Sequence, residues 1–345
     1  ALTANTSGTD NTAVGYAAGD AVTTGSDNTL MGDNAGGAIT TGGSNVAIGS
    51  AALLVATTAS NNVAVGTAAL TANTSGTDNV AVGDSAGTAI TTGSNNTLIG
   101  DVSGTALTTG ASNTAIGANS LQTATTGEQN TALGKQALEA ATTSSYNTAV
   151  GGSAGAATTT GASNTFVGYV AGTANTTGAD NVALGKGALT ANTTGVNNTA
   201  VGALALDAAT TADENTAMGY AALGANTTGS ANTAFGARAL LLNTTTANNT
   251  AIGYYALTDN VGVYNTALGS QALFENTTGG SNVAIGASSL DANTTGGNNT
   301  AVGTSALGAN TTASDNTAVG LSSLAANTTG ASNVGLGSYA LDANT

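Results

Sequence analysis

Recurring Asn-Thr pairs are the residues of this chain whose types and spacing could do chemistry. Asn, then any residue except Pro, then Thr or Ser is the acceptor pattern for N-linked glycosylation. The triplets Asn-Thr-Thr and Asn-Thr-Ser fit it, and they stand in Gly-rich, turn-forming surroundings. We therefore predict exposed turns that could carry a row of sugars along one edge of the molecule. The ten candidate glycosylation sites are Asn5, Asn73, Asn175, Asn192, Asn226, Asn243, Asn276, Asn293, Asn310 and Asn327.

Four Asn-Asn-Thr triplets match the same pattern at Asn95, Asn197, Asn248 and Asn298. Asn and Thr are both abundant, so chance matches are expected, and the alternative is an unmodified turn with hydrogen-bonding hydroxyls. The neighbouring threonines could instead carry O-linked sugars. Thr-rich rows are also typical of ice-binding faces, although adjacent Thr-Thr pairs would point to opposite faces of a strand.

Side chains for acid–base and metal chemistry are scarce. The chain has no His and no Cys, and its basic side chains are Lys135, Lys186 and Arg238. No nucleophile–base pair for covalent catalysis is visible, so we predict that the protein is not an enzyme and uses no cofactor. The acidic residues are scattered, for example Asp27 and Asp78. A calcium ion takes six to eight oxygens, so we predict no metal site.

Composition limits the partners and the fold class. The net charge of −15 would repel a phosphate backbone or an anionic membrane surface, and no apolar run of 18 residues could span a bilayer. We expect neither nucleic-acid binding nor membrane insertion. Disorder needs low hydrophobicity and high charge, whereas this chain is 41% apolar and 6% charged. A thin, regularly packed core fits better.

A 17-residue repeat fills the whole chain. An Asn followed by Thr or Val, a small residue, an aliphatic residue and Gly recurs twenty times, with one spacing of 16 between Asn249 and Asn265. A fixed short period is typical of solenoids. The anchors, taken as repeat position 1, are Asn11, Asn28, Asn45, Asn62, Asn79, Asn96, Asn113, Asn130, Asn147, Asn164, Asn181, Asn198, Asn215, Asn232, Asn249, Asn265, Asn282, Asn299, Asn316 and Asn333.

The first five repeat positions indicate a short strand that ends at a glycine. Positions 2 and 4 are β-branched or apolar and share one face by alternation, and we assign that face to the core. Position 3 is Ala in sixteen copies, with Leu30, Leu98, Phe166 and Gly335 as exceptions. The invariant Gly at position 5 indicates a turn with positive φ or a close approach between chains.

Positions 9 and 12 are expected to fill one core volume. Position 9 is Leu in fourteen copies and Gly in six, and in four of those six position 12 becomes aliphatic, as at Val22 and Ile39. Because a void in a close-packed interior lowers stability, this exchange places both positions inside. Thr-Thr or Thr-Ser follows at positions 13 and 14, then a turn-forming stretch.

These patterns predict an all-β fold, a parallel β-solenoid (β-roll) of about twenty 17-residue coils with two short strands per coil. The whole chain, residues 1–345, would form a single repetitive domain. Stacked Asn side chains at position 1 would exchange amide hydrogen bonds from coil to coil. The one-residue deletion in the coil that begins at Asn249 falls in a turn, where it leaves the strand face unchanged.

The segments Asn45-Val46-Ala47-Ile48-Gly49 and Asn282-Val283-Ala284-Ile285-Gly286 resemble the head repeat of trimeric autotransporter adhesins, which are YadA-like β-rolls. The longer unit also resembles repeats of bacterial and phage tail-fibre-like surface proteins. The resemblance covers the whole chain. It implies a left-handed parallel β-roll, commonly trimeric, on an exported fibre used for attachment. The 17-residue period is longer than that of the adhesin heads.

We therefore expect a structural subunit of an extracellular or cell-surface fibre that self-associates head to tail or as a homotrimer. Alternatives are a trimeric adhesin or phage tail-fibre shaft, and an ice-binding or glycan-binding solenoid. The sequence starts at repeat position 8 and stops at position 13 without the polar cap that solenoids need. On that basis the chain is expected to be a segment of a longer fibre.

Overall fold

The computed structural model describes residues 1–344 and divides into two compact units, Ala1–Gly178 and a second unit that starts at Ala179. Both are parallel β-solenoids, as predicted, and the described residues contain no helix. The first unit contains β1 (Thr12–Val14), β2 (Thr29–Met31), β3 (Val46–Ile48), β4 (Val63–Val65), β5 (Val80–Val82), β6 (Thr97–Ile99), β7 (Thr114–Ile116), β8 (Thr131–Leu133), β9 (Thr148–Val150) and β10 (Thr165–Val167).

The second unit repeats this construction. Its strands are β11 (Val182–Leu184), β12 (Thr199–Val201), β13 (Thr216–Met218), β14 (Thr233–Phe235), β15 (Thr250–Ile252), β16 (Thr266–Leu268), β17 (Val283–Ile285), β18 (Thr300–Val302), β19 (Thr317–Val319) and β20 (Val334–Leu336). Described residues form no helix long and apolar enough to cross a membrane.

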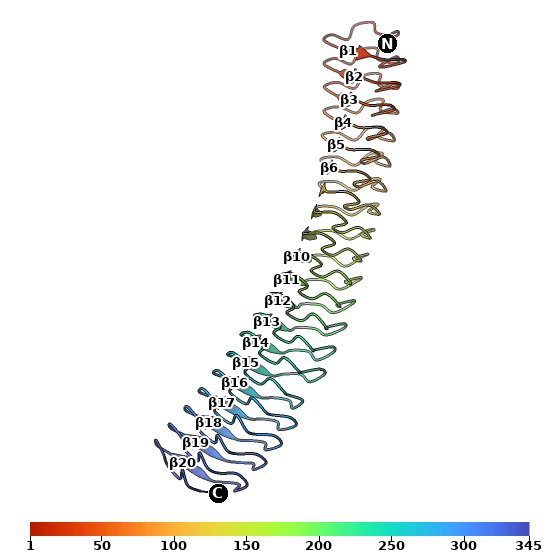
Figure 1. Ribbon diagram of the computed structural model, residues 1–345. Coiled ribbons are helices and arrows are strands. Elements are labelled where there is room, and N and C mark those ends of the chain that lie inside the picture. The colour runs from red at the N-terminus through yellow and green to blue at the C-terminus, as the bar shows by residue number, and fades with distance from the viewer. Residues whose placement is uncertain (345) are drawn as a thin grey trace. The chain divides into compact units, whose positions relative to one another are not determined.

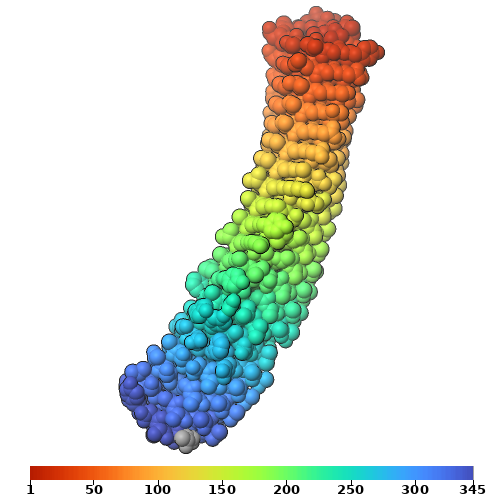
Figure 2. Space-filling model, in the orientation of Figure 1, coloured from red at the N-terminus to blue at the C-terminus, as the bar shows by residue number. Residues whose placement is uncertain are grey.

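Each coil stacks on the next in parallel register. Strand β3 pairs with β4 so that Val46 lies opposite Val63, and the same register links consecutive strands within each unit. Strands β1 to β6 lie one above the other along one side of the first unit (Figure 1). In the space-filling view the atoms of that unit form layers that follow the coils (orange to yellow in Figure 2).

Each coil contains one strand of three residues instead of the two strands that we predicted. The second segment cannot stay extended, because repeat positions 7 and 9 have left-handed backbone conformations, as at Ala51 (φ 56°) and Leu53 (φ 52°). It still bonds from coil to coil, for example through the Leu53 amide, which donates to the Ala69 carbonyl at 2.9 Å. Successive coils are therefore joined by backbone hydrogen bonds between their turns as well as between their strands.

The prediction that positions 2 and 4 face the core is wrong. In β4, Ala64 is fully buried, while Val63 and Val65 on either side are half-buried. Alternation showed correctly that positions 2 and 4 share a face, but it could not say which face is inside. The interior is too narrow for two branched side chains opposite Leu at position 9, so Ala at position 3 points inward.

The core consists of thin layers of Ala at position 3, Ala or Ser at position 8, Leu at position 9 and the side chain at position 12. Val22, Ile39, Ile90 and Leu107 are all fully buried at position 12, so the predicted burial of positions 9 and 12 is confirmed. Position 3 also takes part in the exchange of volume. A Cβ built on Gly155 would lie 2.6 Å from Phe166 Cδ2, because the Phe166 ring occupies the space that Leu fills elsewhere.

The glycines at position 9 occur in pairs, in two neighbouring coils. One large side chain at position 3 fills the space beside both glycines of each pair. Leu30, Leu98 and Phe166 are these side chains, spaced 68 residues apart. Each is fully buried and packs where Cβ atoms on the two glycines would otherwise lie. The residue at position 12 also depends on this side chain. It is aliphatic in the two pairs of coils that contain Leu30 or Leu98, whereas it is Thr158 and Asn175 in the pair that contains the larger Phe166.

The glycine at position 5 has both features that we expected. Gly117 has φ +137°, and a Cβ built on it would lie 2.5 Å from the Gly134 carbonyl oxygen. Coils therefore approach each other at this point too closely for any side chain. The shortened coil is also as predicted. Strands β15 and β16 keep their register, with Thr250 opposite Thr266, so the deletion lies in a turn.

Candidate interaction surfaces

The Asn at position 1 forms the predicted ladder inside each unit. Asn45 receives the Asn62 backbone amide (3.1 Å) and side-chain amide (3.2 Å) at its Oδ1, and its own Nδ2 donates to the Ala59 carbonyl at 2.9 Å. The side chain is fully buried. Nδ2 also donates to Asn28 Oδ1 in the preceding coil at 3.0 Å. Asn45 is therefore bonded to the coils on both sides and, through Ala59, to its own coil, and no group of this amide is left for a ligand.

Nine of the ten predicted glycosylation sites do not lie on an exposed turn. Asn5 is exposed, but the other nine are fully buried: Asn73, Asn175, Asn192, Asn226, Asn243, Asn276, Asn293, Asn310 and Asn327. Asn73 shows the reason, because its Nδ2 donates to the Gly76 carbonyl at 3.0 Å while its Oδ1 accepts the Gly76 amide at 2.8 Å. The prediction that these nine asparagines lie on an exposed turn is therefore wrong: they are interior, and their Nδ2 groups are not accessible in the folded chain.

In the second unit these same residues form a second Asn ladder. Asn293 donates to Asn276 Oδ1 at 2.7 Å, and Asn310 donates to Asn293 Oδ1 at 2.9 Å. We predicted an exposed turn wherever position 12 is Asn. The exchange of volume between positions 9 and 12 already indicated that position 12 is interior, and Asn occupies the same position as the aliphatic residues there. The four Asn-Asn-Thr sites, Asn95, Asn197, Asn248 and Asn298, are exposed.

The two threonines at positions 13 and 14 have different surroundings. At position 13 the hydroxyl donates to the position-13 carbonyl of the next coil, as Thr108 does to Thr125 at 3.0 Å. At position 14 the side chain is exposed, as at Thr109 and Thr126. The turn therefore uses the first hydroxyl to join coils and presents the second to solvent.

The outward face of the strands, which we call the strand face and define by repeat positions 2 and 4, is uncharged and has an apolar side chain at position 4 of every coil. Position 4 is always Val, Ile, Leu, Met or Phe, and position 2 is always Thr or Val. Leu133 is 43% exposed in the first unit, and Phe235 is 52% exposed in the second. None of the charged side chains of the chain falls at positions 1 to 5. Contiguous exposed apolar surface of this kind marks interaction sites in soluble proteins.

An aromatic cluster lies around the shortened coil of the second unit. The rings of Tyr254 and Tyr255 meet edge to face with centroids 4.4 Å apart, and Phe274 is 6.0 Å from Tyr255. The Arg238 guanidinium lies 5.2 Å from the Tyr255 ring centroid and 5.9 Å from that of Tyr220. These contacts are within the range of cation–π attraction, so the cluster stabilises the surface of its own coils.

Beside this cluster is a shallow pocket of about 100 Å³ lined by Gln271, Phe274, Glu275, Asp291 and Ala292. Ligand pockets for small molecules are usually several times larger. Partial burial raises the pKa of Asp291, and the nearby Glu275 carboxylate raises it further. Burial also raises the pKa of Asp207. Among the described residues no group of three or more His, Cys, Asp or Glu side chains could hold a metal ion.

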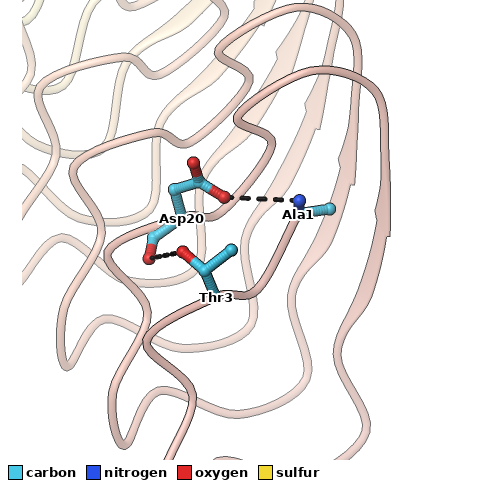
Figure 3. A network of polar contacts seen from close by, with 3 residues as sticks. All are labelled: Ala1, Thr3 and Asp20. Carbon is cyan, nitrogen blue, oxygen red and sulfur yellow. Dashed lines mark hydrogen bonds and ion pairs between the residues drawn. The ribbon is translucent and has the colours of Figure 1, made fainter.

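The described residues contain one ion pair, at the start of the first unit. The N-terminal amino group lies 3.3 Å from an Asp20 carboxylate oxygen, and the Thr3 hydroxyl donates to the Asp20 carbonyl at 3.3 Å (Figure 3). An exposed pair of this type contributes little stability. Cohesion in each unit therefore comes from backbone ladders, Asn ladders and the thin core.

Comparison with protein-family models finds no match, and comparison with curated proteins finds none either. The similarity to adhesin-head and tail-fibre repeats therefore rests on the quoted segments alone.

Proposed function

We propose that the chain is a structural subunit of an extracellular fibre, in which the solenoid is a rigid rod-forming element. The observation that carries this proposal is the stacking of every coil in register on its neighbour within each unit, joined by backbone bonds and by buried Asn ladders. Such a stack resists bending because each coil bonds to the coils on both sides. The scarcity of acid–base side chains also favours a mechanical role over a catalytic one.

Export to the cell surface is supported by the resemblance to adhesin and tail-fibre repeats. Electron microscopy of intact cells, with antibodies raised against a two-coil segment and gold labelling, tests this localisation. We expect label along thin fibres outside the cell. Label confined to the cell interior would contradict the extracellular role.

A second candidate, a laterally associated shaft such as the trimeric adhesin or tail-fibre shaft, is favoured by the strand face. That face has an apolar side chain at position 4 and carries no charge in any coil, whereas the chain as a whole has a net charge of −15. Two copies would repel each other through their charged surfaces, but the strand face could approach another copy without that repulsion. Burial of its aliphatic side chains contributes about 25 cal/mol per Å².

Sedimentation velocity of a strand-face variant tests this association. Leu133→Lys places a charge on the exposed strand face, whereas Gln129→Lys makes the same change in charge at an exposed position off that face. We expect Leu133→Lys to dissociate the assembly and Gln129→Lys to leave it intact. Equal sedimentation of both variants with the unaltered protein would remove the strand face as the interface.

A further inference from the structure

The exposed residue at position 14 is always a hydroxyl amino acid. It is Thr or Ser in every coil that has this position, and all of these side chains are exposed. We call this set the position-14 row; it consists of Ser7, Thr24, Thr41, Thr58, Ser75, Thr92, Thr109, Thr126, Thr143, Thr160 and Thr177 in the first unit and Thr194, Thr211, Thr228, Thr245, Thr278, Thr295, Thr312 and Thr329 in the second.

The substitutions found at two Thr-rich positions, 2 and 14, distinguish what each position requires. Position 2 alternates between Thr and Val, as at Thr29 and Val46, so it requires a β-branched shape and not a hydroxyl. Position 14 alternates between Thr and Ser, as at Thr58 and Ser75, so it requires the hydroxyl and not the methyl group. Internal repetition makes this comparison possible within one chain.

The fold does not explain the requirement at position 14. The position-13 hydroxyl bonds to the next coil, as Thr40 does to the Thr57 carbonyl at 3.0 Å. The hydroxyls of the position-14 row, in contrast, donate no hydrogen bond to any residue among 1–344, which the structure describes. A hydroxyl that shaped the turn would bond to the backbone nearby. Exposed hydroxyls without such a bond are free for chemistry outside the chain.

The shortened coil shows that the turn can form without this side chain, and another position of the turn tolerates varied residues. Position 16, in the same turn, varies among Ala111, Glu128, Val196 and other types. In the shortened coil Val261 donates its amide to the Thr277 carbonyl in the manner of position 13, and Asn249 bonds to the Gly262 carbonyl in the manner of position 15. The deleted residue is therefore position 14, and the neighbouring coils keep their register.

We propose that the position-14 row is a row of acceptors for O-linked saccharides. The Thr or Ser Oγ would attack the anomeric carbon of a nucleotide-activated sugar on a glycosyltransferase. The new bond joins Oγ to that carbon, the bond from the carbon to phosphate breaks, the nucleoside diphosphate leaves, and the hydroxyl proton passes to a base of the transferase. The proposal rests on the fibre role only in assuming that the chain meets such an enzyme.

Charge favours a saccharide over a phosphate as the modification. Coils are about 4.8 Å apart, and each phosphate would add about −1.5 to −2 charges to a chain that already has a net charge of −15. Neighbouring phosphates on successive coils would repel one another strongly. A neutral sugar adds no such repulsion, and it hydrates an edge on which positions 13 to 15 carry no charge.

Peptide mapping of the protein purified from its native source tests the proposal. Cleavage at acidic residues yields peptides that contain the turns, and β-elimination marks the modified residue. We expect saccharide masses on peptides from most coils, at position 14 and not at position 13. Unmodified position-14 residues, phosphate at these residues, or sugars at position 13 instead would overturn it, and thermal hysteresis of the unmodified chain would assign the row to ice binding.

Three variants expressed in the native host make the test specific to the hydroxyl. Thr109→Ser should keep the modification at that coil and Thr109→Val should lose it. Thr108→Val, one residue earlier, should keep the sugar on Thr109 although it removes a bond between coils. Loss of sugar in all three would contradict the assignment. Unglycosylated fibres outside the cell would overturn this inference while leaving the fibre role intact. Glycosylated protein that forms no fibres would support this inference and contradict the fibre role.

Discussion

At the residue scale, the glycine of position 5 permits the closest contact between coils. Gly151 has φ +136°, and a Cβ built on it would lie 2.7 Å from the Gly168 carbonyl carbon. We predict that Gly151→Ala destabilises the first unit by several kcal/mol, because positive φ costs an L-residue about 1–3 kcal/mol and the clash adds to it. Thermal unfolding followed by circular dichroism measures the change.

The neighbouring glycine is a matched control. A Cβ on Gly152 would meet nothing closer than Tyr169 Cδ2 at 3.5 Å, which is ordinary contact. Gly152→Ala should therefore leave stability unchanged or raise it by about 0.4–1 kcal/mol through the unfolded chain. Similar destabilisation by both substitutions would mean that coil spacing at position 5 is not the cause.

Asp291 provides a pH-dependent prediction at the same scale. Burial and the Glu275 carboxylate raise its pKa in the folded chain, so the folded state binds a proton more tightly than the unfolded state. The stability from this group is complete at pH below its unfolded pKa and is lost as pH rises through the folded pKa. Asp291→Asn should raise the unfolding midpoint at pH 7 and change it little at pH 3.

Asp101→Asn is the control for loss of one negative charge, because Asp101 is exposed. Unfolding of both variants and the unaltered chain at pH 3 and pH 7 gives the comparison. An equal gain at pH 7 from both substitutions would show that net charge, and not the burial of Asp291, sets the effect.

At the scale of the element, the interior of each coil has a nearly constant volume, which the side chains at positions 3, 9 and 12 fill together. Phe166 occupies the space left by Gly155 and Gly172. We predict that Phe166→Ala costs about 3–5 kcal/mol, as is usual for large-to-small changes in a close-packed core. Chemical unfolding measures the loss.

The triple variant Phe166→Ala, Gly155→Leu and Gly172→Leu should recover most of that stability. It restores the pattern of the preceding coils, where Leu121 and Leu138 occupy position 9 with φ near +50°. Failure of the two leucines to improve on Phe166→Ala would mean that positions 3 and 9 do not share one volume.

At the scale of the whole molecule, charge and apolar surface are separated by repeat position. Charged side chains avoid positions 1 to 5 and 13 to 15, and the net charge is −15. If copies associate through the strand face, the remaining surfaces repel, and salt screens that repulsion over about 10 Å at 0.1 M. We predict stronger self-association at 0.5 M than at 0.02 M sodium chloride, measured by sedimentation equilibrium. Association that weakens with salt would indicate ionic contacts instead.

Periodicity in the sequence was sufficient for the fold class, the coil length, the Asn ladder and the position of the one-residue deletion. The reason is that repetition places like residues at the same point of every coil, so that a single anchor such as Asn45 predicts its contact with Asn62. The exchange between positions 9 and 12 likewise showed that both are interior, because volumes compensate only within one space.

Only the tertiary structure decided which side of the strand is inside and which asparagines are exposed. Alternation of residues along a strand does not say which of its two faces is buried. We therefore assigned Val63 and Val65 to the core, whereas in the structure the narrow interior of the coil holds Ala64. A glycosylation pattern depends on three adjacent residues, whereas the burial of Asn73 depends on the coils above and below it. Burial is a property of the stack, and no single repeat contains it.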